Sequence, residues 1–250
     1  HQFTYYTEIM RNELVTEQEI SGLMKTALAE EQFIVYYQPQ YNHTTGMLVG
    51  AEALVRWKHP EKGIISPGIF IPIFEKNGFI SKLDMYVFEK ACQFLQKCIR
   101  NKVHLVPVSI NLTRYDIFSP GFIDKLEETR KKYDIPSEYI RVEITESAAL
   151  GSSEFISEAV RKLHSFNYMV EMDDFGSGYS SLNILKDIDF DIIKLDMKFL
   201  NNEFRRIEIH DAISYTGGLR RIYEEKWDLI LLDMTLPVYD VGVQDNGGDK

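Results

Sequence analysis

Helical and strand-like patterns alternate regularly along residues 67–195 of this chain. Helices are expected where apolar residues recur at the spacing of one helix face, and strands where short apolar runs are bounded by turns. We predict helices at 67–76, 81–100, 121–133, 154–166 and 181–185, and strands at 103–112, 139–145, 168–173 and 191–195. Strands separated by helices of this length form βα units, and consecutive units build a parallel sheet. Such a run favours a closed barrel, although periodicity alone also fits an open sheet.

A longer strand-like region precedes these units. Residues 33–40 and 47–57 form two such runs, and the turn-forming segment 42–46 separates them. Two strands so close in sequence are expected to pair as an antiparallel hairpin. Residues 1–31 show helical spacing of their apolar side chains and are predicted to form a linker helix.

Polar side chains interrupt five successive apolar strands at or near their ends. They are Glu52, Asn111, Glu143, Asp173, Asp174 and Lys194. Taken singly, each also fits an ordinary structural role as a salt-bridged strand residue, a turn residue or half of a surface ion pair. Because a polar residue recurs at or near the end of each of these strands, we expect the whole set to meet at one end of the sheet or barrel.

Carboxylates gathered in this way repel one another and are costly to bury. Divalent cations remove that cost, and oxygen ligands from Glu, Asn and Asp suit Mg²⁺ or Mn²⁺. The set contains no His or Cys, which disfavours zinc or copper. Two metal ions could clamp a phosphodiester and generate hydroxide from a bound water. Lys194 could position that water or offset charge on the phosphate.

Two further side chains fit a phosphate or a base as well as a structural role. Arg56, next to Trp57, could hold a phosphate or stack on a base, or it could be a surface arginine with a buried stem. Gln38 could read a base edge, or it could form a hydrogen bond at a strand end.

Composition excludes some classes of function. The formal net charge of −10 argues against binding to the backbone of DNA or RNA, because no basic stripe is available to release counterions. No apolar run is long enough to span a membrane. Cys92 and Cys98 lie in one predicted helix and point to different sides of it, so free thiols are expected, as in a reducing cytoplasm. The chain begins at His1, and we expect it to be a segment of a longer protein.

Six short strings of this chain together resemble the signature of the EAL-domain cyclic di-GMP phosphodiesterases. The strings are QPQ at 38–40, AEALVRWKHP at 51–60, SIN at 109–111, EITE at 143–146, DDFGSGYSS at 173–181 and KLD at 194–196. They occur in the family's order and at its spacing, and the resemblance covers about residues 32–204. The first thirty residues resemble the tail of a GGDEF domain.

The resemblance implies a fold and a metal site. The fold is a modified (β/α)8 TIM-like barrel, an α/β architecture whose first strand is antiparallel. The implied Mg²⁺ or Mn²⁺ ligands are Glu52, Asn111, Glu143 and Asp173, with Asp174 on a second metal ion. The catalytic residues implied are Lys194, Glu52 and Asp174, with Lys194 contacting the catalytic water.

The resemblance also implies the substrate and its contacts. Gln38, Leu54 and Arg56 would contact the dinucleotide. Glu146 would orient the loop at 175–181, which in the family couples the site to dimerisation. The reaction would be hydrolysis of one phosphodiester of cyclic di-GMP to linear pGpG, and a homodimer is expected.

The chain departs from the family after Lys194. Two further strand motifs of the family, one ending in Ala-Glu-Gly-Val-Glu and one carrying a glutamine before Gly and an aromatic residue, do not occur. Residues 219–237 instead resemble part of a response-regulator receiver, with Asp233 at its phosphoacceptor position. The acidic pair and the lysine of a working receiver do not accompany it. Residues 205–250 are therefore either a fusion that leaves a six-strand barrel, or a replacement in which 228–234 form the seventh strand and bring Asp233 near the metals.

These observations give a linker helix at 1–31, an EAL domain at 32–204 and an atypical segment at 205–250. The function predicted is metal-dependent cyclic di-GMP hydrolysis in bacterial signalling. The alternative is a degenerate EAL domain that binds cyclic di-GMP or a partner protein without hydrolysis, because a metal-binding glutamate of the family is missing. We expect a cytoplasmic location, with an upstream GGDEF or sensory domain as a further partner.

Overall fold

The computed structural model of the chain describes residues 8–149, 153–176 and 188–196. Its helices are α1 (Glu8–Ala29), α2 (Pro67–Lys76), α3 (Ile80–Arg100), α4 (Arg114–Ile117), α5 (Phe122–Lys132), α6 (Glu146–Ala149) and α7 (Ser153–Ser165), with a 3-10 turn at Ser137–Tyr139. Its strands are β1 (Phe33–Tyr41), β2 (Leu48–His59), β3 (Gly63–Ile65), β4 (Val108–Leu112), β5 (Ile140–Thr145), β6 (Met169–Phe175) and β7 (Ile192–Leu195). The predicted alternation of strands and helices is confirmed.

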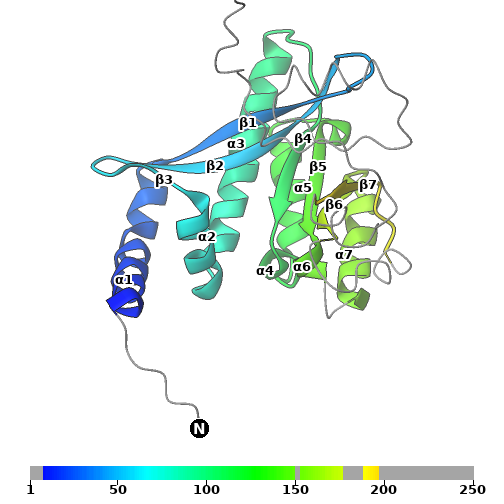
Figure 1. Cartoon of the computed structure of the whole chain (residues 1–250). Coiled ribbons are helices and arrows are strands. Elements are labelled where there is room, and N and C mark those ends of the chain that lie inside the picture. Colours follow the sequence, from blue (N-terminus) through cyan, green and yellow to red (C-terminus); the bar gives the residue numbers. More distant parts are fainter. Residues whose placement is uncertain (1–7, 150–152, 177–187, 197–250) are drawn as a thin grey trace, which may run out of the picture.

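All of these strands belong to one sheet in the order β1-β2-β4-β5-β6-β7, with β3 paired to β2 (Figure 1). β1 runs antiparallel to β2, with Gln38 opposite Glu52, so the predicted hairpin is confirmed. From β2 to β7 the order follows the chain and neighbouring strands are parallel. The α/β fold with an antiparallel first strand is therefore present. The helix predicted at 181–185, and all residues after 196 that a closed barrel would need, lie outside the described residues.

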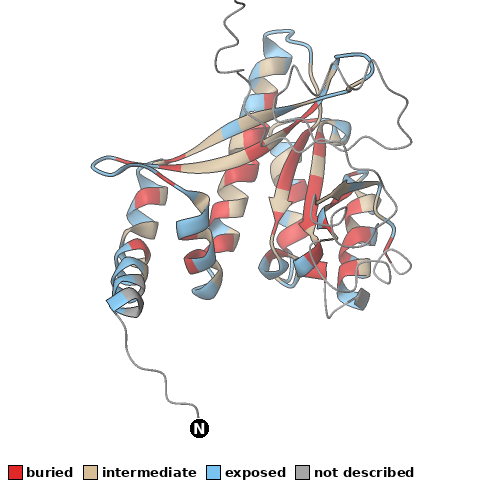
Figure 2. Cartoon of the chain, in the orientation of Figure 1, coloured by how far each residue is buried: buried red, intermediate tan, exposed pale blue. Residues whose placement is uncertain are grey.

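Alternation along each strand separates an apolar face from a polar one. In β5, Ile140, Val142 and Ile144 are buried in the hydrophobic core, which includes side chains of α3, α5 and α7. Arg141 and Glu143 alternate with these residues and therefore point to the opposite face of the sheet. Figure 2 shows the buried residues concentrated in the strands and the helices packed against them. The helices thus cover one face of the parallel strands, and the other face is left to polar side chains.

One predicted strand is corrected, and two short helices were missed. The strand predicted at 103–112 begins only at Val108, because Pro107 has no N–H to give to a neighbouring strand. The short helices α4 and α6 were not predicted, since four residues are too few to show a helical period. A capping box between Thr113 and Asp116 begins α4, and its Thr–x–x–Asp spacing was readable from the sequence.

Two other expectations concern the chain as a whole. Cys92 and Cys98 are free thiols, as predicted, with Cys92 buried. Among the described residues, no helix is both long enough and apolar enough to cross a membrane.

A buried ion pair fastens α5 to β6. Arg130 of α5 donates from Nε and Nη2 to the two carboxylate oxygens of Glu127, at 2.8 and 2.7 Å. The Tyr168 hydroxyl, just before β6, donates to Glu127 at 3.0 Å. Burial opposes ionisation of Glu127, but the hydrogen bonds from Arg130, Lys131 and Tyr168 outweigh it and lower its pKa.

Replacing Arg130 by methionine is expected to lower the free energy of unfolding by about 3–5 kcal/mol, because it leaves the Glu127 carboxylate buried without its bidentate partner. The pKa of Glu127 is lowered on folding, so its stabilisation is present above its ordinary pKa of 4.5 and is lost as pH falls through the folded-state value. Urea unfolding should therefore show a large deficit at neutral pH and a smaller one in acid. Arg161→Met, at an exposed position of α7, is the matched control; an equal deficit there would contradict the assignment.

Candidate active site

Most of the polar residues predicted to converge lie on one face of the sheet, and Asp174 is the exception. Glu52 of β2 is in register with Ser109 of β4, and Asn111 of β4 is in register with Glu143 of β5. Thr145 of β5 is in register with Asp173 of β6. In a sheet, residues in register on neighbouring strands point to the same side. The parallel register therefore places these groups in rows near the carboxyl ends of the strands, where α/β proteins build their sites.

Lys194 of β7 lies at the centre of this acidic group. Its ammonium donates a hydrogen bond to Glu143 and lies 3.5 Å from carboxylate oxygens of both Glu52 and Glu171. Burial lowers the pKa of Lys194, although Glu52 acts in the opposite direction. The positive charge of Lys194 thus offsets the cost of burying these carboxylates.

Two predicted ligands retain oxygen atoms suited to a cation. Asn111 donates from Nδ2 to Glu52 at 3.0 Å, which fixes the orientation of its amide. Glu143 is fully buried, and its Oε2 atom has no hydrogen-bond partner. A buried carboxylate oxygen without a donor is costly, and a metal ion would satisfy it. In the described part of the chain, no three His, Cys, Asp or Glu side chains are arranged as a ready metal-binding group.

The oxygen donors of Glu52, Asn111, Glu143 and Asp173 fit Mg²⁺ or Mn²⁺ in kind, because these ions prefer carboxylate and carbonyl oxygen. Their present arrangement is organised around Lys194. A metal ion bound by these carboxylates would lie close to the ammonium and compete with it for Glu143. The position of Lys194 among these carboxylates is a property of the tertiary structure that the sequence did not predict.

The aspartate pair ends β6 in an irregular backbone. The register of β6 against β7 shifts between Met172 and Phe175, and Asp174 has φ = +56°. Aspartate tolerates this left-handed conformation better than most residues, and the bulge re-aims side chains at the strand end. Burial, and then the charge of Asp174, raise the pKa of Asp173 to about 6. Asp173 is half-buried and Asp174 is exposed, so the two carboxylates face different surroundings.

Glu146, at the start of α6, is fully buried and accepts a hydrogen bond from the Gly176 N–H at 2.8 Å. It thus holds the first residues after β6. The remainder of the loop that it was predicted to orient lies outside the described residues.

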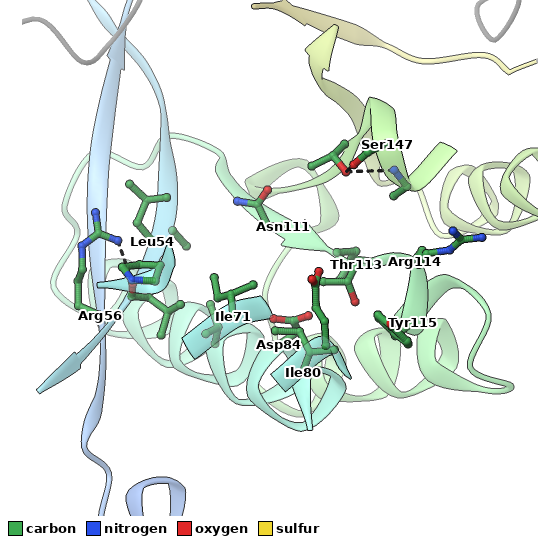
Figure 3. Close-up of a pocket in the computed structure, with 18 residues that line it drawn as sticks. Leu54, Arg56, Ile71, Ile80, Asp84, Asn111, Thr113, Arg114, Tyr115 and Ser147 are labelled. Carbon is green, nitrogen blue, oxygen red and sulfur yellow. Dashed lines mark hydrogen bonds between the residues drawn. The ribbon is translucent and has the colours of Figure 1, made fainter. Parts of the chain in front are cut away.

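A cavity of about 500 Å³ opens beside the acidic group (Figure 3). Leu54 and Arg56 of β2 lie on one side of it, Arg114 and Tyr115 of α4 on the other, and Asp84 of α3 between them. Arg56 donates to the Val55 carbonyl at 2.8 Å, and its guanidinium lies 5.9 Å from the centre of the Tyr36 ring. Of the three residues predicted to contact a dinucleotide, Leu54 and Arg56 line the cavity. Gln38 lies opposite Glu52 in the hairpin.

Asp84, which lines the cavity, forms with Asp116 of α4 a buried acid pair that sequence reasoning missed. Burial, and then Asp116, raise the pKa of Asp84 well above its ordinary value. Asp84 Oδ2 and Asp116 Oδ1 are each buried without a hydrogen-bond donor, and a proton held on Asp84 would satisfy both. Asp84 follows the buried Leu83 in α3, so the helical period offered only a weak signal of this burial.

Glu171 is the other missed residue. It lies two positions before Asp173 in β6, so the period of a strand already placed it on the same face. The predicted Asp233 and the receiver-like stretch lie outside the described residues.

Comparison with known families and proteins is consistent with this geometry. The model of the EAL domain family matches residues 23–214. The bifunctional diguanylate cyclase/cyclic di-GMP phosphodiesterase MucR of Pseudomonas aeruginosa is 30% identical over 178 residues, covering 71% of this chain and 26% of MucR. The signaling protein YkoW of Bacillus subtilis is 27% identical over 201 residues, covering 80% of this chain and 25% of YkoW. The chain thus spans about a quarter of the length of these relatives.

Solved structures agree. The MucR phosphodiesterase in complex with c-di-GMP superposes with a TM-score of 0.68 at 29% identity, covering 73% of this chain and 74% of that one. The EAL enzyme Bd1971, bound to cAMP and cyclic di-GMP, gives a TM-score of 0.68 at 27% identity, covering 78% of this chain and 54% of that one. These similarities support a TIM-barrel-like fold for the described strands.

Proposed function

The chain belongs to the EAL domain family, and from that premise we propose that it hydrolyses cyclic di-GMP to linear pGpG with Mg²⁺ or Mn²⁺. The observation that carries the proposal is the meeting of Glu52, Asn111, Glu143 and Lys194 beside a cavity that contains arginines. Oxygen ligands next to a partly apolar cavity that contains arginines suit a phosphodiester flanked by bases.

Within this proposal, Glu52, Asn111, Glu143 and Asp173 hold the first metal ion, and Asp174 contributes to a second. Metal ions held by these residues would supply neutralisation of charge on the phosphodiester and a bound water of lowered pKa. Asn111 presents its Oδ1 atom because its Nδ2 atom is engaged by Glu52. Glu143 contributes its unpartnered Oε2 atom.

Lys194 has two properties that fit a role beside the attacking water. Its ammonium lies among the ligand carboxylates, within 3.5 Å of Glu52. Its pKa is lowered by burial, which weakens its hold on a proton relative to a lysine in solvent. It can therefore donate a hydrogen bond that orients the water and offset charge on the phosphate.

The cavity supplies the remaining contacts to the dinucleotide. Arg56 can pair with a phosphate, and Leu54 offers an apolar surface to a base. Asp84 lines the same cavity, and its raised pKa keeps it uncharged there, so it would not repel a phosphate held by Arg56. Gln38 and a homodimer remain part of the proposal on family grounds.

Replacing Arg56 by methionine should weaken cyclic di-GMP binding about 10- to 100-fold, the range expected when a charged hydrogen-bonding partner is lost. KM is expected to rise more than kcat falls, because the guanidinium holds the phosphate and takes no part in proton transfer. Calorimetry in the presence of Ca²⁺ would measure the affinity for cyclic di-GMP, and steady-state kinetics would measure KM and kcat. Arg100→Met, exposed at the end of α3, is the control. Unchanged binding in Arg56→Met would contradict the assignment.

The decisive test of the function is incubation of the purified chain with cyclic di-GMP and Mg²⁺ or Mn²⁺, with pGpG followed by chromatography. Metal-dependent turnover that disappears in Glu52→Ala would support the proposal. Binding without turnover would instead support the alternative of a domain that senses cyclic di-GMP, as the missing seventh-strand glutamate motif allows.

A further inference from the structure

Glu171 is a buried carboxylate beneath the metal-ligand set. Its side chain is 1% exposed. It lies in register with Glu143 on the neighbouring strand and points to the same face of the sheet. Such a group needs partners of its own, since an isolated buried carboxylate is among the most costly features of a protein interior.

Three side chains supply those partners. Ser109 of β4 donates to Glu171 Oε2 at 2.9 Å, and Arg141 of β5 forms an ion pair with Glu171 Oε1 at 3.2 Å. Lys194 lies 3.5 Å from Oε2. Arg141 itself is held close to the start of β2, with its Nη2 atom 3.5 Å from the Val49 carbonyl. Glu171 is thus held by side chains of β4 and β5, and its Oε2 atom also faces Lys194 of β7.

This arrangement matters because Lys194 competes for the carboxylates that would bind metal. In the structure its ammonium forms ion pairs with Glu52, Glu143 and Glu171. A cation at Glu52 and Glu143 would repel the ammonium and take over both of these partners. Glu171 has its two oxygens occupied by Ser109 and Arg141, so of the three it is the least available to a metal ion. It is therefore the carboxylate that can keep Lys194 in the site.

We propose that Glu171 is a positioning residue that retains the Lys194 ammonium when divalent cations take Glu52 and Glu143. Metal binding and the placement of the lysine are then coupled, because the ammonium loses its ion pair with Glu143 and keeps the one with Glu171. The inference extends the proposed function, but its central claim concerns metal binding and can be read without cyclic di-GMP.

The test is Mn²⁺ binding by calorimetry to the wild-type chain, Glu171→Gln, Lys194→Met and the double variant, all without nucleotide. Glu171→Gln should raise the Kd for Mn²⁺ about tenfold, the scale seen when a partner of a metal site is lost. Lys194→Met should lower the Kd, because it removes the competing charge. In the Lys194→Met background, Glu171→Gln should change the Kd less than twofold. Glu158→Gln, in α7, is the matched control.

The double variant separates this role from a general effect of negative charge. An equal rise of Kd in both backgrounds would mean that Glu171 acts on the metal directly and would overturn the proposal. A wild-type chain that binds no Mn²⁺ would also overturn it.

If Glu171→Gln does not fold, Ser109→Ala is the second variant, because it removes one of the hydrogen bonds that fix Glu171. It should raise the Kd for Mn²⁺ by a smaller factor, and only when Lys194 is present. Mn²⁺ binding with the predicted shifts but without turnover of cyclic di-GMP would leave this inference standing and refute only the proposed hydrolysis.

Discussion

Replacing Glu143 by glutamine is expected to lower cyclic di-GMP hydrolysis about a thousandfold, near the upper end of what removal of one charge-stabilising group costs. Glu143 is fully buried, and its Oε2 atom is free of hydrogen bonds. Glutamine has nearly the same shape but carries no charge, so it should weaken the metal site without opening a cavity. Lys194 keeps Glu52 and Glu171 as partners in the variant, and the fold should therefore be retained.

The assay is steady-state turnover over a range of Mn²⁺ concentrations, beside thermal unfolding. Glu154→Gln removes the same charge from an exposed position of α7 and should leave turnover unchanged. A Glu143→Gln variant with near wild-type turnover would show that the reaction does not use this carboxylate. A variant that is inactive and also unfolded would leave its stability, and not its chemistry, as the cause.

Replacing Lys194 by methionine should strongly destabilise the metal-free protein. In the absence of metal, the change leaves the carboxylates of Glu52, Glu143 and Glu171 facing one another without a cation. Removing one partner of a buried ionic group typically costs about 3–5 kcal/mol. We expect the free energy of unfolding of the metal-free protein to fall by about that amount, and hydrolysis to fall as well.

Metal should reverse the loss of stability but not the loss of activity. Mn²⁺ can replace the missing positive charge, and a ligand that binds only the folded state raises its stability by mass action. Urea unfolding in EDTA and in Mn²⁺ would measure both states. Lys58→Met, at an exposed position of β2, is the control. A Lys194→Met variant as stable as wild type in EDTA would show that the ammonium does not balance these acids.

The strand pattern was sufficient to predict the face on which the site lies. The period of two put Ser109 and Asn111 on one side of β4, and the recurrence of polar residues at strand ends placed Glu52, Glu143 and Asp173 near one another. The same reasoning could have found Glu171, because it lies two residues before Asp173. It was missed because the polar residues at the strand ends were singled out, and Glu171 lies in the middle of the strand predicted at 168–173.

The sequence by itself determined the order of helices and strands, the antiparallel hairpin, the free cysteines and the family, because each depends on short-range pattern or on motifs read in order. Only the tertiary structure decided which polar groups touch. Lys194 meets Glu143 and Glu171, Arg141 pairs with Glu171, and Asp84 reaches Asp116. These partners lie on separate elements brought together by parallel pairing and by helix packing. Alternation along a strand determines the face of the sheet to which a side chain points. The side chains next to it on that face depend on the register between strands, which no local pattern encodes.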